Sequence, residues 1–169
     1  IDIYKDATDF AKKKGLNIFE SQFTEYLPQI IESKSFSLIT FMESIYYFED
    51  PKTVLLKAKS LLEKNGLLII QTINGDSTYF NNRTFFSRYG DNVQFIPTFK
   101  SINYWLKDLS FTVLETTALP RFKINKLLKY NRSFKSVVRN FGLFLNRLDY
   151  FNKNPIRSSD KLIIIARKN

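Results

Sequence analysis

The sequence predicts an α/β fold, a mostly parallel sheet with helices on both faces, from three observations. Two short apolar runs without charge, Phe36–Phe41 and Leu67–Thr72, are typical of parallel strands that are covered on both faces. A helical pattern lies between them, and such strand–helix–strand units close right-handed in nearly all proteins. At 169 residues, the chain fits one domain with a sizeable core.

The first elements follow the same order. Ile1–Ile3 has the pattern of a strand end. Asp6–Lys14 is predicted to be a helix, because acids stand in its first turn and three lysines in its last, and Gly15 terminates it. Leu16–Phe19 is predicted to be a further short strand.

The helix between the two apolar runs is predicted to begin at Asp50-Pro51, a capping side chain followed by a proline at the first helical position. Its apolar residues recur on one face. Asn65-Gly66 is predicted to supply a left-handed stop. Further along, Phe99–Leu106 is predicted to be a helix capped by Thr98.

Phe111–Thr116 and Lys161–Ala166 are predicted to be the last two strands, because their content of β-branched residues is high. Between them, Arg121–Leu148 carries eight basic residues, no acid and apolar residues at helical spacing. Residues 1–120 hold 13 Lys/Arg and 14 Asp/Glu, whereas residues 121–169 hold 13 and 2. The net charge of +10 therefore belongs to one segment, which we expect to form helices.

Composition excludes several classes of site. The chain has no cysteine and no histidine, so disulfides, thiolate metal sites and Ser-His-Asp or Cys-His triads are excluded within it, and we expect no metal. No apolar run approaches the length of a membrane span, and no signal peptide is visible. We therefore expect a cytoplasmic protein.

Four motifs in order, FSLITF, EDP, SLLEKNG and LLIIQT, resemble the second half of a class I S-adenosylmethionine-dependent methyltransferase. The resemblance covers about residues 1–119 and, more loosely, the final strand. It implies a Rossmann-like sheet with an antiparallel last strand inserted between the two before it, and a single domain over 1–169. Residues 120–157 would then be a basic helical insert. The alternative is another doubly wound α/β domain.

The glycine-rich loop of that family is absent, because the five glycines form no G-x-G. By the resemblance, the chain is an N-terminally truncated fragment whose missing central strand leaves a gap. Such a fragment should bind S-adenosylmethionine feebly or not at all.

The resemblance also implies which residues bind the cofactor. Asp2 would accept the ribose hydroxyls, unless it is an ordinary strand-end carboxylate, and its neighbour Ile3 would also belong to the cofactor site. In the loop after Leu16–Phe19, Gln22 stands near the place of the family's adenine-binding acid. Phe23 would cover the adenine, unless it belongs to the core.

After Phe36–Phe41, Met42 and Glu43 line up with family residues that flank the methionine end of the cofactor. Many relatives have Glu-His a little further on, where this chain has Tyr46-Tyr47. These tyrosines would orient an acceptor or form a half-buried aromatic pair. A long loop from Ile73 to Asn92 would line an acceptor pocket with Asn74, Tyr79, Phe80, Arg83 and Tyr89.

The resemblance predicts a methyltransferase acting on a small molecule or glycan. No catalytic residue is assigned, because positioning and a dry pocket provide most of what this reaction needs. The alternative is a non-enzymatic module that binds anionic membrane or RNA through the basic insert. Three interpretations of the insert are possible: a lid over the acceptor pocket, a surface for anionic membrane, or an RNA or partner contact. The lid is favoured. In a lid, the side chains of Lys126, Lys129, Arg132 and Lys135 would face solvent or an anionic acceptor. No known RNA-binding module is indicated, and the oligomeric state is not predicted.

Overall fold

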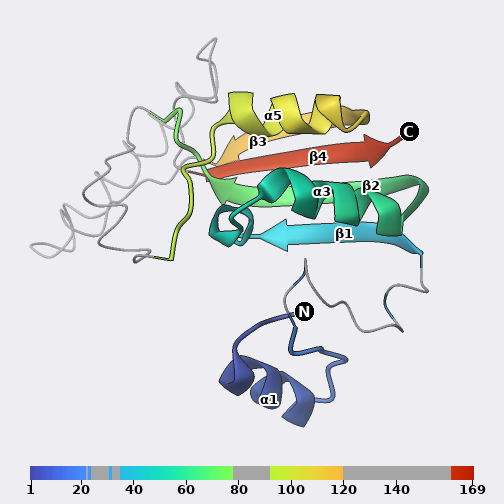
Figure 1. The fold of residues 1–169 in the computed structure, drawn as a ribbon, viewed down its shortest axis with the longest axis vertical. Helices are drawn as coiled ribbons and strands as arrows, with labels where there is room; N and C mark the ends of the chain where they lie inside the picture. Colours follow the sequence, from blue (N-terminus) through green and yellow to red (C-terminus); the bar gives the residue numbers. More distant parts are fainter. Residues whose placement is uncertain (22, 24–30, 32–34, 78–91, 120–160) are drawn as a thin grey trace, which may run out of the picture.

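The computed structural model describes residues 1–21, 23, 31, 35–77, 92–119 and 161–169. A four-stranded sheet with the order β1-β2-β4-β3 forms its centre (Figure 1). β1 and β2 are parallel, whereas β4 is antiparallel to both of its neighbours. The predicted α/β sheet is therefore confirmed, with the last strand inserted between two earlier ones. The strands are β1, Phe36–Met42; β2, Leu62–Ile73; β3, Phe111–Leu119; and β4, Lys161–Lys168.

Both predicted helix starts are confirmed. Asp50 Oδ1 accepts hydrogen bonds of 3.1 Å from two backbone amides in the first turn of α3, Pro51–Leu61. At the start of α5, Phe99–Asp108, Thr98 Oγ1 accepts from the backbone amide of Ser101 at 3.0 Å, and the Ser101 hydroxyl accepts in return from the Thr98 amide. Each cap satisfies amides that have no partner within the helix.

The predicted stop at Asn65-Gly66 is wrong, because α3 ends at Leu61 and β2 begins at the next residue. Asn65 does adopt the left-handed conformation, with φ of 64°. It does so within β2, where the pairing with β1 shifts register just after Phe36. A Cβ on Gly66 would lie 3.1 Å from the Phe36 carbonyl oxygen, so the glycine permits a close approach of the two strands.

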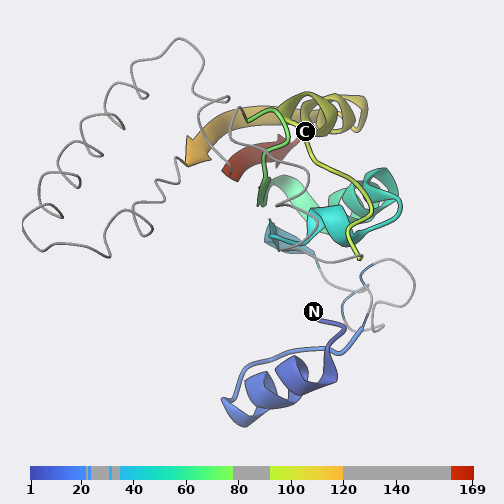
Figure 2. The ribbon, with the colours of Figure 1, turned by 90° about the vertical axis from the view of Figure 1, so that its left-hand side faces the viewer.

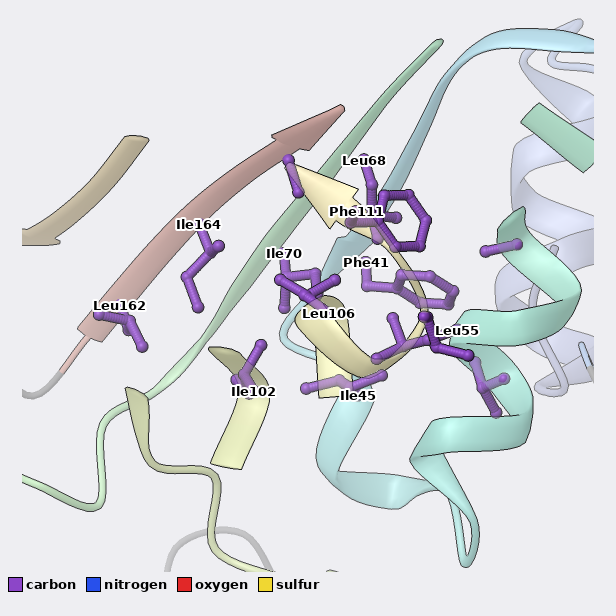
Figure 3. Packing of buried hydrophobic residues seen from close by; sticks show 14 of the residues in the cluster. Phe41, Ile45, Leu55, Leu68, Ile70, Ile102, Leu106, Phe111, Leu162 and Ile164 are labelled. Carbon is purple, nitrogen blue, oxygen red and sulfur yellow. The ribbon is translucent and has the colours of Figure 1, made fainter. Parts of the chain in front are cut away.

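α3 and α5 pack on the same face of the sheet (Figure 2). Along β2, buried residues alternate with half-buried ones, so the described part of this strand has one fully buried face rather than two. The core between the sheet and these helices is apolar (Figure 3). It includes Phe41, Ile45, Leu55, Leu68, Ile70, Ile102, Leu106, Phe111, Leu162 and Ile164.

The N-terminal segment is built differently. Its helix α1, Lys5–Lys13, lies beyond β1 and away from the other helices in both views (Figures 1 and 2). The predicted strands Ile1–Ile3 and Leu16–Phe19 are wrong as strands, since they are reduced to one parallel bridge between Asp2 and Glu20. Ile1, Ile3 and Leu16 remain largely exposed, whereas Ile18 and Phe19 are half-buried, so neither segment has the fully packed face that would support a longer ladder.

The basic insert predicted over 120–157 lies outside the described residues. The described residues on either side of it, Leu119 and Lys161, both belong to the sheet. Leu119, the last residue of β3, pairs with Lys161, the first residue of β4. Lys161 also pairs with Ile73 at the end of β2. The chain therefore leaves and re-enters the sheet at the carboxyl end of β2.

Candidate functional site

A large cavity runs along β1 between the sheet and the N-terminal segment. Its volume is about 1520 Å³. One wall is β1 itself, which is an edge strand of the sheet. The facing wall is Ile1–Tyr4, with Phe19, Ser21 and Phe23. The loop that follows β1 and the segment before α5 contribute one end, at the carboxyl ends of β1 and β2, where open α/β sheets bind their ligands.

Asp2 and its neighbour Ile3 line this cavity, and their contact with a cofactor stays a prediction. The backbone of Asp2 donates to the Phe19 carbonyl oxygen and accepts from Ser21, each at 3.1 Å. Its Oδ1 accepts from the Tyr4 amide at 2.9 Å. The bridge with Glu20 therefore holds Asp2 at the cavity wall, and its carboxylate carries a second oxygen beyond the one that caps this turn.

Phe23 also lines the cavity, but it packs on the core at the same time. Its ring meets that of Phe41 edge to face, with 5.3 Å between the centroids. Phe23 is therefore packed on the core and also lines the cavity, and its contact with an adenine stays a prediction. Gln22 lies outside the described residues.

Met42 and Glu43 both line the cavity at the end of β1, and their contact with the cofactor stays a prediction. Met42 is 54% exposed and presents its side chain at the surface. Glu43 is engaged within the protein: its Oε1 accepts from Gln71 Nε2 at 3.1 Å, its Oε2 accepts from the Tyr46 hydroxyl at 3.2 Å, and it forms an ion pair with Lys161.

The two adjacent tyrosines have different environments. Tyr46 is 1% exposed, and its hydroxyl reaches Glu43. Tyr47 is 42% exposed and lines the cavity, with its ring 4.6 Å from that of Tyr46. Tyr46 is therefore a structural residue, whereas Tyr47 is available to a ligand. The sequence alone does not distinguish the two roles.

The predicted acceptor loop is only partly described, since Tyr79, Phe80, Arg83 and Tyr89 lie outside the described residues. Asn74 is wrong as a pocket residue, because it is fully buried and its Oδ1 accepts from the Asp76 amide at 3.1 Å. Asp76 in turn caps the Phe99 amide of α5 at 2.8 Å. These contacts fix the start of the loop against α5.

Two polar residues that line the cavity, Asn92 and Gln94, were not predicted. The backbone amide of Gln94 donates to the Tyr46 carbonyl oxygen at 2.9 Å. No motif marks them in the sequence. Their place depends on a backbone hydrogen bond to a turn that lies far away along the chain.

The charged side chains among the described residues that line the cavity are all acidic. They are Asp2, Glu43, Glu49 and Asp50. The Thr53 hydroxyl donates to Asp50 and, with the Thr53 and Lys52 amides, holds the pKa of that carboxyl below its usual value. In a chain of net charge +10, this cavity favours neutral or cationic ligands over anions.

Two other features, a metal site and a membrane-spanning helix, are not found in the described part of the chain. No group of three or more acidic residues lies close enough to hold a metal ion there. No helix among the described residues is long and apolar enough to cross a membrane.

A family model for a methyltransferase domain matches residues 1–116. Ubiquinone biosynthesis O-methyltransferase of Glaesserella parasuis serovar 5 is 36% identical over 72 residues, which are 40% of this chain and 30% of that protein. The uncharacterized protein MJ1123 of Methanocaldococcus jannaschii is 27% identical over 132 residues, 76% of this chain and 62% of that one. The match thus spans less than two thirds of the length of either relative.

The fold has close counterparts among solved structures. The crystal structure of a SAM-dependent methyltransferase from Archaeoglobus fulgidus matches 99% of this chain and 74% of its own, with a TM-score of 0.60 and 18% identity. At this identity, the likeness supports the fold alone.

Proposed function

The chain belongs to the methyltransferase domain family, the class I S-adenosylmethionine-dependent methyltransferases, and from this we propose that it transfers a methyl group to a small-molecule or glycan acceptor. The observation that supports the proposal best is a cavity that brings Asp2 of the N-terminal segment together with Met42 and Tyr47 at the end of β1. One end of the cavity lies at the carboxyl ends of the parallel strands, where such folds bind their ligands.

The residues of the cavity fit part of the cofactor. S-adenosylmethionine, when bound, supplies a methyl group activated on a cationic sulfonium. We infer that Asp2 accepts a ribose hydroxyl, because its carboxylate has a second oxygen beyond the one bonded to Tyr4. Ile3 and Phe23 would provide apolar contact for the adenine. The acidic lining suits a cation, although Glu43 is engaged with other protein groups.

The acceptor end would be formed by uncharged polar groups. Ser44, Tyr47, Asn92 and Gln94 line this part of the cavity and offer a hydroxyl, a phenol and two amides. These groups can orient an acceptor by hydrogen bonds, which is the main demand that the reaction makes of the protein. We propose that the basic insert serves as a lid. In support, Leu119 and Lys161, the described residues on either side of it, lie at the carboxyl end of β2.

A second function is favoured by the uneven distribution of charge. Residues 121–169 hold 13 basic and 2 acidic residues, whereas residues 1–120 are close to neutral. A module of this kind would bind anionic membrane or RNA through Arg121–Leu148. Replacing Lys126, Lys129, Arg132 and Lys135 with Gln would then abolish a salt-sensitive association with anionic vesicles or RNA. A lid would leave any such association unaltered by the same change.

Calorimetry with S-adenosylhomocysteine tests the main proposal. We expect saturable binding, with a stoichiometry near one, by the full-length protein rather than by a fragment that lacks the glycine-rich loop. A protein that binds no ligand at millimolar concentration would remove the enzyme proposal.

A further inference from the structure

The loop after β1 contains a strained turn at Glu43. Its φ is 55°, in the left-handed region that residues other than glycine seldom adopt. The Glu43 amide donates to the Gln71 carbonyl oxygen of β2 at 2.8 Å. Met42 and Ser44, on either side of it, both line the cavity. A strained backbone that is held in place at a ligand cavity points to a positioning role.

The Glu43 side chain binds three other elements of the protein. Its carboxylate accepts from Gln71 of β2 and from the Tyr46 hydroxyl, and it pairs with Lys161 of β4. The side chains of Glu43 and Lys161 are only 27% and 18% exposed. Charge pairs that are shielded from water in this way interact more strongly than surface pairs.

Lys161 connects this network to another part of the chain. It is the residue at which the chain re-enters the sheet after residues 120–160. In the strand register, it lies opposite Leu119 of β3 and Ile73 of β2. One ion pair therefore joins the loop at the cavity to the root of the insert.

We propose that Glu43 is a positioning residue, which Lys161 locks so that Met42 and Ser44 face the ligand. Although Glu43 lines the cavity, in this proposal it acts through its two neighbours rather than by contact with the ligand. The inference rests on the proposed function, since the ligand in question is the S-adenosyl cofactor.

The test compares S-adenosylhomocysteine affinity in four variants of the full protein. Lys161→Met, Glu43→Gln and the double variant should each weaken binding about tenfold, because the two residues act as one unit and their effects do not add. Lys52→Met is the matched control, since it breaks the exposed Lys52–Asp108 pair of 2.6 Å, and Lys52 does not line the cavity. It should change the affinity less than about twofold.

Amide hydrogen exchange provides a second readout that does not depend on the ligand. Lys161→Met should raise the exchange rate of the Glu43 amide about tenfold, and Lys52→Met should not. If Lys161→Met does not fold, the S-adenosylhomocysteine affinity of Glu43→Gln tests the positioning role instead, because this substitution keeps the size of the side chain.

The outcomes separate this inference from the proposed function. A wild-type protein that binds no S-adenosylhomocysteine overturns both. A wild-type protein that binds it, with unchanged affinity in Lys161→Met and Glu43→Gln, overturns the positioning role alone. A lower thermal midpoint with unchanged affinity also overturns the positioning role, since the network would then be structural only.

Discussion

The four-stranded sheet and the N-terminal segment contain similar apolar runs but use them differently. In β2 and β4, apolar residues such as Leu68 and Ile164 are fully buried between the sheet and two helices. In the N-terminal segment, Ile3 and Leu16 are 58% and 62% exposed, and one bridge replaces a ladder. An apolar run therefore becomes a strand only where a neighbouring strand and a covering helix are both present. The candidate cavity lies between these two regions.

The largest expected difference between the regions is in stability. Leu106→Ala should lower the free energy of unfolding by about 3 kcal/mol, because Leu106 is fully buried and its loss leaves a cavity in the core. Leu16→Ala is the matched change in the N-terminal segment, and it should cost less than about 0.5 kcal/mol. Urea unfolding of both variants measures this. Equal losses would mean that the two regions fold as one packed unit.

Asp2 tests whether the weakly packed region contributes to binding. Asp2→Ala should weaken S-adenosylhomocysteine binding by about 1.5–3 kcal/mol, the range for a hydrogen bond to a charged group. Its effect on the free energy of unfolding should be small. Asp9→Ala is the control, since Asp9 forms an exposed pair with Lys5 on α1 and does not line the cavity. Unchanged affinity in Asp2→Ala would make this acid purely structural.

Two glycines, Gly75 beside α5 and Gly15 in the N-terminal segment, compare how tightly the two regions are packed. Gly75→Ala should destabilise the protein by about 2 kcal/mol, because a Cβ there would lie 2.7 Å from Ile96 Cγ2 and 2.9 Å from the Pro97 carbonyl oxygen. Gly15→Ala should cost only about 1 kcal/mol, since Gly15 has φ of 75° but nothing within 4 Å of the added atom. Thermal unfolding of each variant gives the two values. The reverse order would contradict the packing described around α5.

The smallest expected effect comes from the cap of α3. Asp50→Ala should cost about 1 kcal/mol, because two amides lose their acceptor. The lowered pKa of Asp50 means that the ionised cap stabilises the fold above the usual pKa of 3.8, and this contribution is lost as pH falls through the lower folded value. Asp50→Asn should keep much of the stability at neutral pH and remove this pH dependence. A pH dependence that persists in Asp50→Asn would assign it to another group.

Local signals in the sequence predicted most of the sheet and its two helices. Asp50-Pro51 and Thr98 mark helix starts by chemistry that acts within four residues, so no tertiary information is needed. By contrast, no local signal was used to predict the left-handed φ of 57° at Ser110, between α5 and β3.

The candidate site was predictable only in part. Asp2, Met42 and Phe23 were singled out by the resemblance to the family, and the structure brings them to one cavity. The engagement of Glu43 was not predictable, because it depends on Lys161, which lies on the last strand. The different burial of Tyr46 and Tyr47 depends on long-range packing in the same way.

The central claim is that the cavity along β1 binds the S-adenosyl cofactor, and Met42 allows a direct test. Met42 is the only methionine in the chain, it is 54% exposed, and it lines the cavity. In protein labelled with ¹³C in the methionine methyl group, the Met42 resonance is identified by its loss in Met42→Leu, and it reports on this site. We predict that S-adenosylhomocysteine shifts this resonance in a saturable titration that follows the calorimetric binding curve. Saturable binding by calorimetry with an unmoved Met42 resonance would place the ligand elsewhere and contradict the claim.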